Sequence, residues 1–397
     1  MPRHRALIVL AAYLGWTLDA FDFFIMVFVF NDVARHFHAG LTLNSLTLTL
    51  TLAMRPLGAF LLGRLADRHG RRPALMASIL GYSLLEFTSG LAPTLGLFLV
   101  SRALFGIAMG GEWGVGAALT FESVPPSWRG RISGLLQAGY PSGYLLATVL
   151  FAFAYPYLGW RGMFFVGAAP ALLVLLVRGF VPESPAFTAS AQNFPRQSVP
   201  FRPPLRLTLF AIALMTAFNF LSHGTQDLYP SFLLGQLHLG HPTAASIAVA
   251  YNVAAIVGGL ICGIVSQTWG RRRTIATVVL LILPAIPLWA FATTPLCLGL
   301  GAVLVQFCVQ GAWGVVPAHL NELAPASVRG TFPGFVYQFG NFLAAGNATI
   351  QSATAAALGH DLRLPLAGMA ALMALSVAAL VWLGPEARHA EFGTAEI

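Results

Sequence analysis

Residues 63–72 read GRLADRHGRR, and a partial copy, GIVSQTWGRR, lies at residues 263–272, about 200 positions later. Both copies sit between long apolar runs. Further pieces recur at or close to this offset: 111–114 (GEWG) with 311–314 (GAWG), Glu122 with Glu322, Arg129-Gly130 with Arg329-Gly330, and Pro182-Glu183 with Pro385-Glu386. Matches at equivalent places predict that the chain consists of two related halves.

The composition indicates a membrane protein. Of the 397 residues, 57% are hydrophobic and only 9% are charged, and the mean hydropathy is +0.74. A soluble protein of this size could not keep its surface in water with so few charges. The apolar runs are about 20 residues long, which is the length that crosses a bilayer as a helix. Spanning strands would instead show short alternating segments. The sequence therefore predicts an all-α integral membrane protein.

Twelve transmembrane helices are predicted, six in each pseudo-symmetric half. Residues 1–182 form the N-terminal half, 183–205 a cytoplasmic linker, and 206–397 the C-terminal half. Parallel repeats of this kind enclose a binding cavity near the middle of the membrane. The predicted spans are 6–30, 42–63, 74–92, 96–118, 131–156, 162–181, 206–234, 244–267, 274–292, 296–319, 331–357 and 364–383.

The positions of the arginines predict the orientation. All 22 basic residues are arginine, and only Arg35, Arg161 and Arg363 fall in loops after odd-numbered spans. By the positive-inside rule, both termini and the loops after even-numbered spans are cytoplasmic, and the chain is expected in the cell inner (plasma) membrane. The basic charge is thus explained by topology rather than by a nucleic-acid surface. The arginines assigned to the cytoplasmic loops are Arg64, Arg68, Arg71, Arg72, Arg129, Arg131, Arg178, Arg196, Arg202, Arg206, Arg271, Arg272, Arg273 and Arg329.

The sequence carries no motif of an enzyme. Clusters with metal-ligand spacing, phosphate-binding glycine loops and nucleophile motifs are absent from it. Its three cysteines fall within predicted spans, which implies no disulfide framework. We expect no catalysis, no metal and no cofactor. The lipid bilayer is an expected partner, no nucleic acid is expected, and the protein is expected to be a monomer.

A polar stripe interrupts the apolar run at 207–234. Asn219, His223 and Asp227 are spaced i, i+4 and i+8, so they drift by only about 40° per step on a helix and share one face. Gln226 lies three positions after His223 and joins them. Such groups are costly in lipid unless they face protein or water. The stripe therefore predicts polar side chains that face a cavity, with Asn219, His223 and Gln226 as hydrogen-bonding groups and Asp227 as a titratable acid.

Buried acids in the N-terminal half are the other candidate proton carriers. Asp19 and Asp22 lie three apart on one face of the first span, and two carboxylates so close in a low dielectric do not both ionise readily. The alternative is that Asp19 lies near an interface and bonds to a helix end. Glu112 is a third candidate, since its repeat partner is Ala312 and the fold does not require an acid there. Glu86 is expected to be a packing or interfacial residue.

Arg102 in the fourth span cannot lose its charge, so it must pair with a carboxylate of the protein or of a ligand. A transport role and a structural ion pair, for instance with Glu112 or Asp22, both stay open. Arg55, which precedes a proline in the second span, is a weaker candidate for transport. The predicted cavity amides, with interhelical hydrogen bonds as the alternative, are Gln137, Gln338 and Asn341.

Residues 63–72 match the loop 2–3 signature G-x-L-x-D-R-x-G-R-R, so the chain resembles the major facilitator superfamily over essentially its whole length. The resemblance implies a fold of two six-helix halves. In the second copy Gln267 replaces the acidic residue, so a charge lock is not implied there. The residues to which the resemblance gives a conformational role are Gly63, Asp67, Arg68, Gly70 and Arg71.

A narrower resemblance lies in the polar stripe. Residues 219–227 are similar to the N-x-x-S/T-H-x-S/T-Q-D signature of lactate/pyruvate permeases in the sialate/lactate proton-symporter branch, and 15–24 and 55–58 also look like that branch. This implies proton-coupled uptake of short monocarboxylates such as lactate or pyruvate by alternating access, with a small organic anion and a proton as partners. Asn219, His223, Gln226 and Arg102 would then bind the anion. Asp227 would be one of the acids that carry the proton. The alternatives are a symporter of sialic or aromatic acids and an efflux antiporter for organic compounds.

Overall fold

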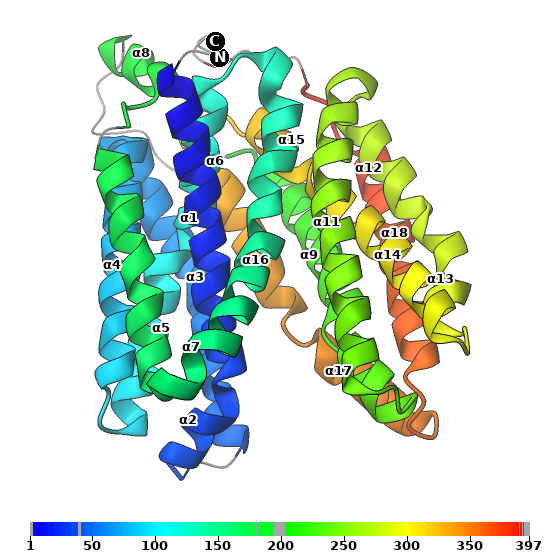
Figure 1. Ribbon diagram of the computed structural model, residues 1–397. Helices are drawn as coiled ribbons and strands as arrows, with labels where there is room; N and C mark the ends of the chain where they lie inside the picture. The colour runs from blue at the N-terminus through cyan, green and yellow to red at the C-terminus, as the bar shows by residue number, and fades with distance from the viewer. Residues whose placement is uncertain are drawn as a thin grey trace.

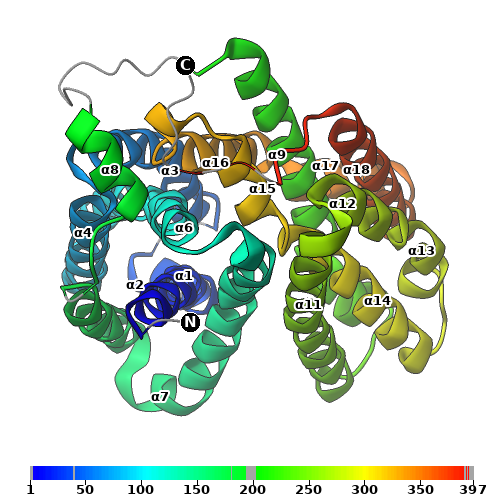
Figure 2. The same cartoon turned by 90° about the horizontal axis from the view of Figure 1, so that it is seen from above.

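The computed structural model describes residues 3–38, 41–179, 181–193, 203–388, 390 and 392, and these ranges contain helices but no strand. Ten of the described helices are long and apolar enough to cross a membrane. Figure 1 shows two helix bundles, one coloured blue to green and the other green to red, and Figure 2 shows the same two bundles from above. The predicted all-α fold with two halves is confirmed.

Each bundle is built from one half of the sequence. The N-terminal bundle contains α1 (Arg3–Phe28), α2 (Phe30–His36), α3 (Leu41–His69), α4 (Arg71–Leu91), α5 (Leu95–Gly110), α6 (Glu112–Ser123), η1 (Pro126–Trp128), α7 (Arg129–Gly179) and α8 (Pro185–Asn193). The C-terminal bundle contains α9 (Leu205–Gln226), α10 (Tyr229–Ser231), η3 (Phe232–Gln236), α11 (His241–Trp269), α12 (Arg271–Leu280), α13 (Ile282–Ala290), α14 (Pro295–Trp313), α15 (Val316–Leu323), η4 (Ala326–Val328), α16 (Phe332–Ala344), α17 (Asn347–Ala357) and α18 (Arg363–Leu383).

Two elements explain why ten long helices correspond to twelve predicted spans. A straight helix with the 51 residues of α7 would be about 75 Å long, more than twice the thickness of the hydrocarbon layer. Gly159, at φ 60° and ψ −175°, breaks it, and its teal and green arms meet at the bottom of Figure 1. The predicted span at 331–357 is divided into α16 and α17, neither of which is long enough to cross alone.

Part of the predicted linker is helical. Residues 185–193 form α8, and residues 194–202 lie outside the described ranges. Of the residues of the loop signature, Gly63 lies within α3, and Arg68 is exposed near the end of that helix. Gly70 connects α3 to α4 at φ 110°, a backbone conformation that favours glycine.

The repeat in the sequence is also a repeat of contacts. Arg71 donates to both oxygens of Glu122, at 3.1 and 2.9 Å, and Arg271 donates to both oxygens of Glu322, at 3.0 and 2.9 Å. Bidentate pairs of this kind fix orientation as well as charge. Arg71 was predicted in a loop, but it is the first residue of α4 and is buried, because its guanidinium turns inward to this carboxylate.

Hydrogen bonds join the two halves at the end of the molecule that carries the loop signature. Asp67 accepts from the backbone N–H groups of Gly330 and Thr331, at 2.8 and 3.1 Å, and from the Thr331 hydroxyl at 2.5 Å. At the equivalent place Gln267 accepts from the backbone N–H of Gly130 at 2.8 Å. Gln267 therefore keeps a hydrogen bond between the halves, although its side chain carries no charge.

Glycines let the helices meet closely at the same end. A Cβ on Gly134 would lie 2.4 Å from the carbonyl oxygen of Gly259, and a Cβ on Gly63 would lie 2.5 Å from the Cα of Thr331. Real Cβ atoms do not approach other atoms so closely, so only glycine fits at these two positions. The backbones of α7 and α11, and those of α3 and the start of α16, are therefore in direct contact. This end of the molecule is closed in the structure.

Candidate functional site

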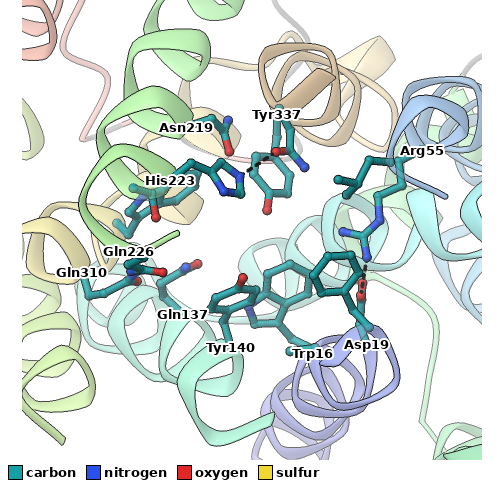
Figure 3. Close-up of a pocket in the computed structure, with 16 residues that line it drawn as sticks. Trp16, Asp19, Arg55, Gln137, Tyr140, Asn219, His223, Gln226, Gln310 and Tyr337 are labelled. Atoms are coloured by element: carbon teal, nitrogen blue, oxygen red, sulfur yellow. Dashed lines mark hydrogen bonds and ion pairs between the residues drawn. The ribbon is translucent and has the colours of Figure 1, made fainter. Parts of the chain in front are cut away.

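A cavity lies between the two halves and has about 580 Å³ of empty space, including space open to solvent. Residues of α1, α3 and α7 line it from the N-terminal half, and residues of α9, α14 and α16 line it from the C-terminal half. Figure 3 shows the side chains that face it.

The predicted stripe on α9 forms one wall of this cavity. Asn219, His223 and Gln226 line it. His223 Nδ1 lies 3.2 Å from Asp227 Oδ1, and His223 Nε2 lies 3.1 Å from Asn341 Oδ1 on α16. Both ring nitrogens thus face an oxygen acceptor, an arrangement that a doubly protonated imidazolium satisfies completely. Asp227 is not itself a lining residue, although 38% of its side chain is exposed.

Gln226 is held in place by a residue that sequence reasoning missed. Its Nε2 donates to Oε1 of Gln306 on α14 at 2.8 Å. Gln306 is buried, and its own Nε2 donates to the Thr225 hydroxyl at 3.2 Å. The signal that could have found Gln306 is a second carboxamide, Gln310, one helical turn later in the same apolar run.

An ion pair forms part of the opposite wall. Arg55 Nη2 on α3 lies 3.2 Å from Asp19 Oδ1 on α1, and both side chains line the cavity, as the dashed line in Figure 3 marks. The second oxygen of Asp19 is buried and has no hydrogen-bond partner in the described part of the chain. Arg55 was the weaker candidate from the sequence, yet its guanidinium is the one at this wall.

Arg102 does not reach the cavity. It is fully buried, its Nη1 lies 2.6 Å from Glu86 Oε2, and its guanidinium stacks 3.9 Å from the centre of the Phe105 ring. The anion-binding role is therefore not supported. The alternative of a structural ion pair agrees with the structure, but the partner of Arg102 is Glu86 rather than Glu112 or Asp22. The packing of α4 against α5 brings Glu86 to Arg102, so this acid belongs to a buried ion pair.

Glu112 also pairs inside the N-terminal bundle. Its Oε1 lies 2.6 Å from Arg178 Nη2, and it does not line the cavity. Arg178 was predicted in a cytoplasmic loop, but it lies near the end of α7 with 3% of its side chain exposed. The pair lies against α1 at Gly15, where a Cβ would be 2.2 Å from the Glu112 oxygen. A side chain at position 15 would displace this ion pair.

Two further predicted residues lie behind the walls. Asp22 is fully buried, and neither of its oxygens has a hydrogen-bond partner among the described residues. A buried carboxyl with no partner is best accommodated as the neutral acid. Gln338 is 1% exposed and both of its amide atoms are similarly unpartnered, whereas Asn341, one turn along α16, lines the cavity.

Aromatic side chains that the sequence did not single out connect the two halves beside the cavity. The Tyr337 ring on α16 lies 4.6 Å from Trp113, 6.4 Å from Trp16 and 5.5 Å from Trp313, measured between ring centroids. Tyr140 completes this aromatic cluster at 5.9 Å from Trp16. The sequence did offer a signal, since Trp113 and Trp313 are equivalent residues of the repeat.

Comparisons with protein families, known sequences and solved structures all match this chain to transporters. The family described as Major Facilitator Superfamily matches residues 6–346. The chain is 32% identical over 359 residues to a probable 4-methylmuconolactone transporter of Cupriavidus pinatubonensis, with 85% of this chain and 81% of that protein covered. It is 28% identical over 374 residues to a carboxylic acid transporter protein homolog of Saccharomyces cerevisiae, with 86% of this chain covered but only 60% of the yeast protein. In structure it is similar to the proton:xylose symporter XylE, with a TM-score of 0.76, 18% identity and 96% of each chain covered.

Proposed function

Because the chain belongs to the major facilitator superfamily, we propose that it is a proton-coupled symporter that takes up short monocarboxylates such as lactate or pyruvate. The observation that carries this proposal is the Arg55–Asp19 ion pair in the cavity wall, which faces the His223 wall of the other half. This arrangement places a permanent cation, a titratable acid and further donors around one small space. A carboxylate ligand needs such donors.

The ion pair explains how a proton and an anion travel together. Arginine keeps its charge, so a proton arriving at the pair goes to Asp19. Protonation removes the partner of Arg55, and the long side chain is then free to turn into the cavity and bind a carboxylate. Uptake of one proton with one monocarboxylate is electroneutral. Binding of the same anion by His223 on α9 draws the two halves together around the ligand.

Alternating access follows from the two-fold arrangement of the halves. The end with Asp67 and Gln267 is closed, so release on that side requires the bonds of these residues to Thr331 and Gly130 to break. We propose that the halves rock about the cavity and that this closed end opens to the cytoplasm.

A second candidate is a symporter of aromatic acids, and the cavity wall favours it in one respect. Trp16, Tyr140 and Tyr337 line the cavity and could stack on a flat ligand. The relatives named for a methylmuconolactone and for carboxylic acids keep a broader range of organic acids open. Sialic acid uptake and efflux of organic compounds are the remaining alternatives.

Transport by purified protein in liposomes tests the proposal. With an acidic exterior we expect labelled lactate to accumulate above its outside concentration, because the inward proton gradient drives the anion. A protonophore should abolish the accumulation, and protein-free liposomes measure the passive entry of the protonated acid, which the transporter should exceed. Lactate uptake that ignores an imposed pH gradient would refute proton coupling. If benzoate or sialic acid accumulates and lactate does not, the protein is a symporter of aromatic acids or of sialic acid instead.

A further inference from the structure

We propose that Gln137, Gln226 and Gln310 form a carboxamide subsite for the oxygen at carbon 2 of a 2-hydroxy or 2-oxo acid. This inference rests on the proposed function and adds the feature that separates lactate and pyruvate from unsubstituted acids. The subsite lies away from Arg55 and Asp19 in the cavity, as Figure 3 shows.

The three glutamines come from both halves. Gln137 lies on α7 of the N-terminal half, and Gln226 and Gln310 lie on α9 and α14 of the C-terminal half. A ligand that bonds to all three therefore contacts both bundles at once. Such a contact is sensitive to the relative position of the halves, as the binding step of a rocking transporter requires.

Unsatisfied hydrogen-bonding capacity points to a polar ligand group. Gln137 and Gln310 are 5% and 4% exposed, and the Oε1 atoms of both are buried without a hydrogen-bond partner in the described ranges. Leaving such groups unpaired destabilises the protein. A carboxamide both donates and accepts, so it can accept from a ligand hydroxyl or donate to a ligand keto group. The same three side chains can thus bind both oxidation states.

Gln226 is oriented for this role. Its Nε2 already donates to Gln306, which in turn donates to Thr225, and this chain of bonds fixes the plane of the amide. The second N–H and Oε1 of Gln226 are left for a ligand. Gln226 lies three positions after His223, so the two side chains are neighbours on the face of α9, about 5–6 Å apart at Cβ. A three-carbon acid can place its carboxylate at His223 and its 2-oxygen at the glutamines.

Competition between three acids in liposomes tests the subsite. Propionate has the carboxylate and chain length of lactate and pyruvate but lacks the 2-oxygen. We expect the wild type to prefer lactate and pyruvate to propionate by about tenfold in kcat/KM, the ratio that one hydrogen bond supplies. Gln310→Leu should reduce this preference to about threefold or less, with propionate uptake unchanged. Gln137→Leu, on the other half, should do the same.

The controls separate this inference from the proposed function. Gln236→Leu removes a glutamine that bonds to Asp361 away from the cavity, and it should keep the wild-type preference. Thermal unfolding of each variant checks that it is folded. If Gln310→Leu and Gln137→Leu keep the lactate preference, or lose propionate uptake as fully as lactate uptake, the subsite is refuted. If the wild type carries none of the three acids, the proposed function itself fails.

Discussion

Asp19→Asn is expected to abolish accumulation of lactate driven by a pH gradient while leaving exchange of lactate across the membrane intact. Asparagine imitates the protonated acid, so Arg55 is permanently free to bind the anion but no proton can be released after it. The loaded carrier still rocks in both directions. Two liposome assays measure this difference: net uptake under an acid-outside gradient, and counterflow of labelled lactate against unlabelled lactate inside.

Variants of two other charged residues serve as controls for Asp19→Asn. Arg55→Leu should lose net uptake and counterflow together, because the cation that binds the anion is gone. Asp32→Asn should keep both, since this acid pairs with Arg35 at 2.5 Å outside the cavity. If Asp19→Asn still concentrates lactate under a pH gradient, the proton is carried by another acid, and Asp22, Glu112 and Asp227 become the candidates to replace in turn.

Arg102→Leu is expected to destabilise the fold rather than to alter transport selectively. Glu86 would be left as an uncompensated carboxyl in the interior, and removing one partner of a buried ion pair costs about 3–5 kcal/mol. The yield of folded protein and its melting temperature in detergent should fall sharply. The double variant Arg102→Leu/Glu86→Leu should recover most of the loss, because an apolar pair of similar volume can replace a buried ion pair.

Transport measured on the double variant separates a structural role from a direct one. Recovered stability together with uptake close to that of the wild type would establish Arg102 as a packing residue of the α4–α5 contact. If the double variant is stable but does not take up lactate, the ion pair is required for transport. Such a result would also show that the buried pair affects the cavity from a distance, since neither partner lines it.

The fold could be predicted well from the sequence because its main signals do not depend on knowing which residues are in contact. Hydropathy defines spans, and the repeat at 63–72 and 263–272 identifies the halves without knowledge of any contact. The stripe on α9 was recognisable for the same reason, since its members share one helix face. Asn219, His223 and Gln226 line the cavity in agreement with that expectation, whereas Asp227 does not, and the roles of all four are proposals.

The partners of the buried charges could not be predicted from the sequence. Arg55 and Arg102 are both single arginines in apolar runs, and only helix packing decides that one faces the cavity and the other faces Glu86. Arg178 was misplaced because an arginine at the end of an apolar run satisfies the positive-inside pattern equally well in a loop and in a helix. Its burial depends on Glu112, which is 66 positions away in the sequence.

The aromatic cluster gives the protein an intrinsic optical reporter. Three of its eight tryptophans, at positions 16, 113 and 313, surround Tyr337 where the halves meet. The cluster joins rings of both halves, so a relative movement of the halves there changes the surroundings of the indoles, and the fluorescence of the unlabelled protein should change when a transported acid binds. A titration in detergent would report ligand binding directly, and an emission spectrum that stays constant at saturating substrate would show that these rings move as one body.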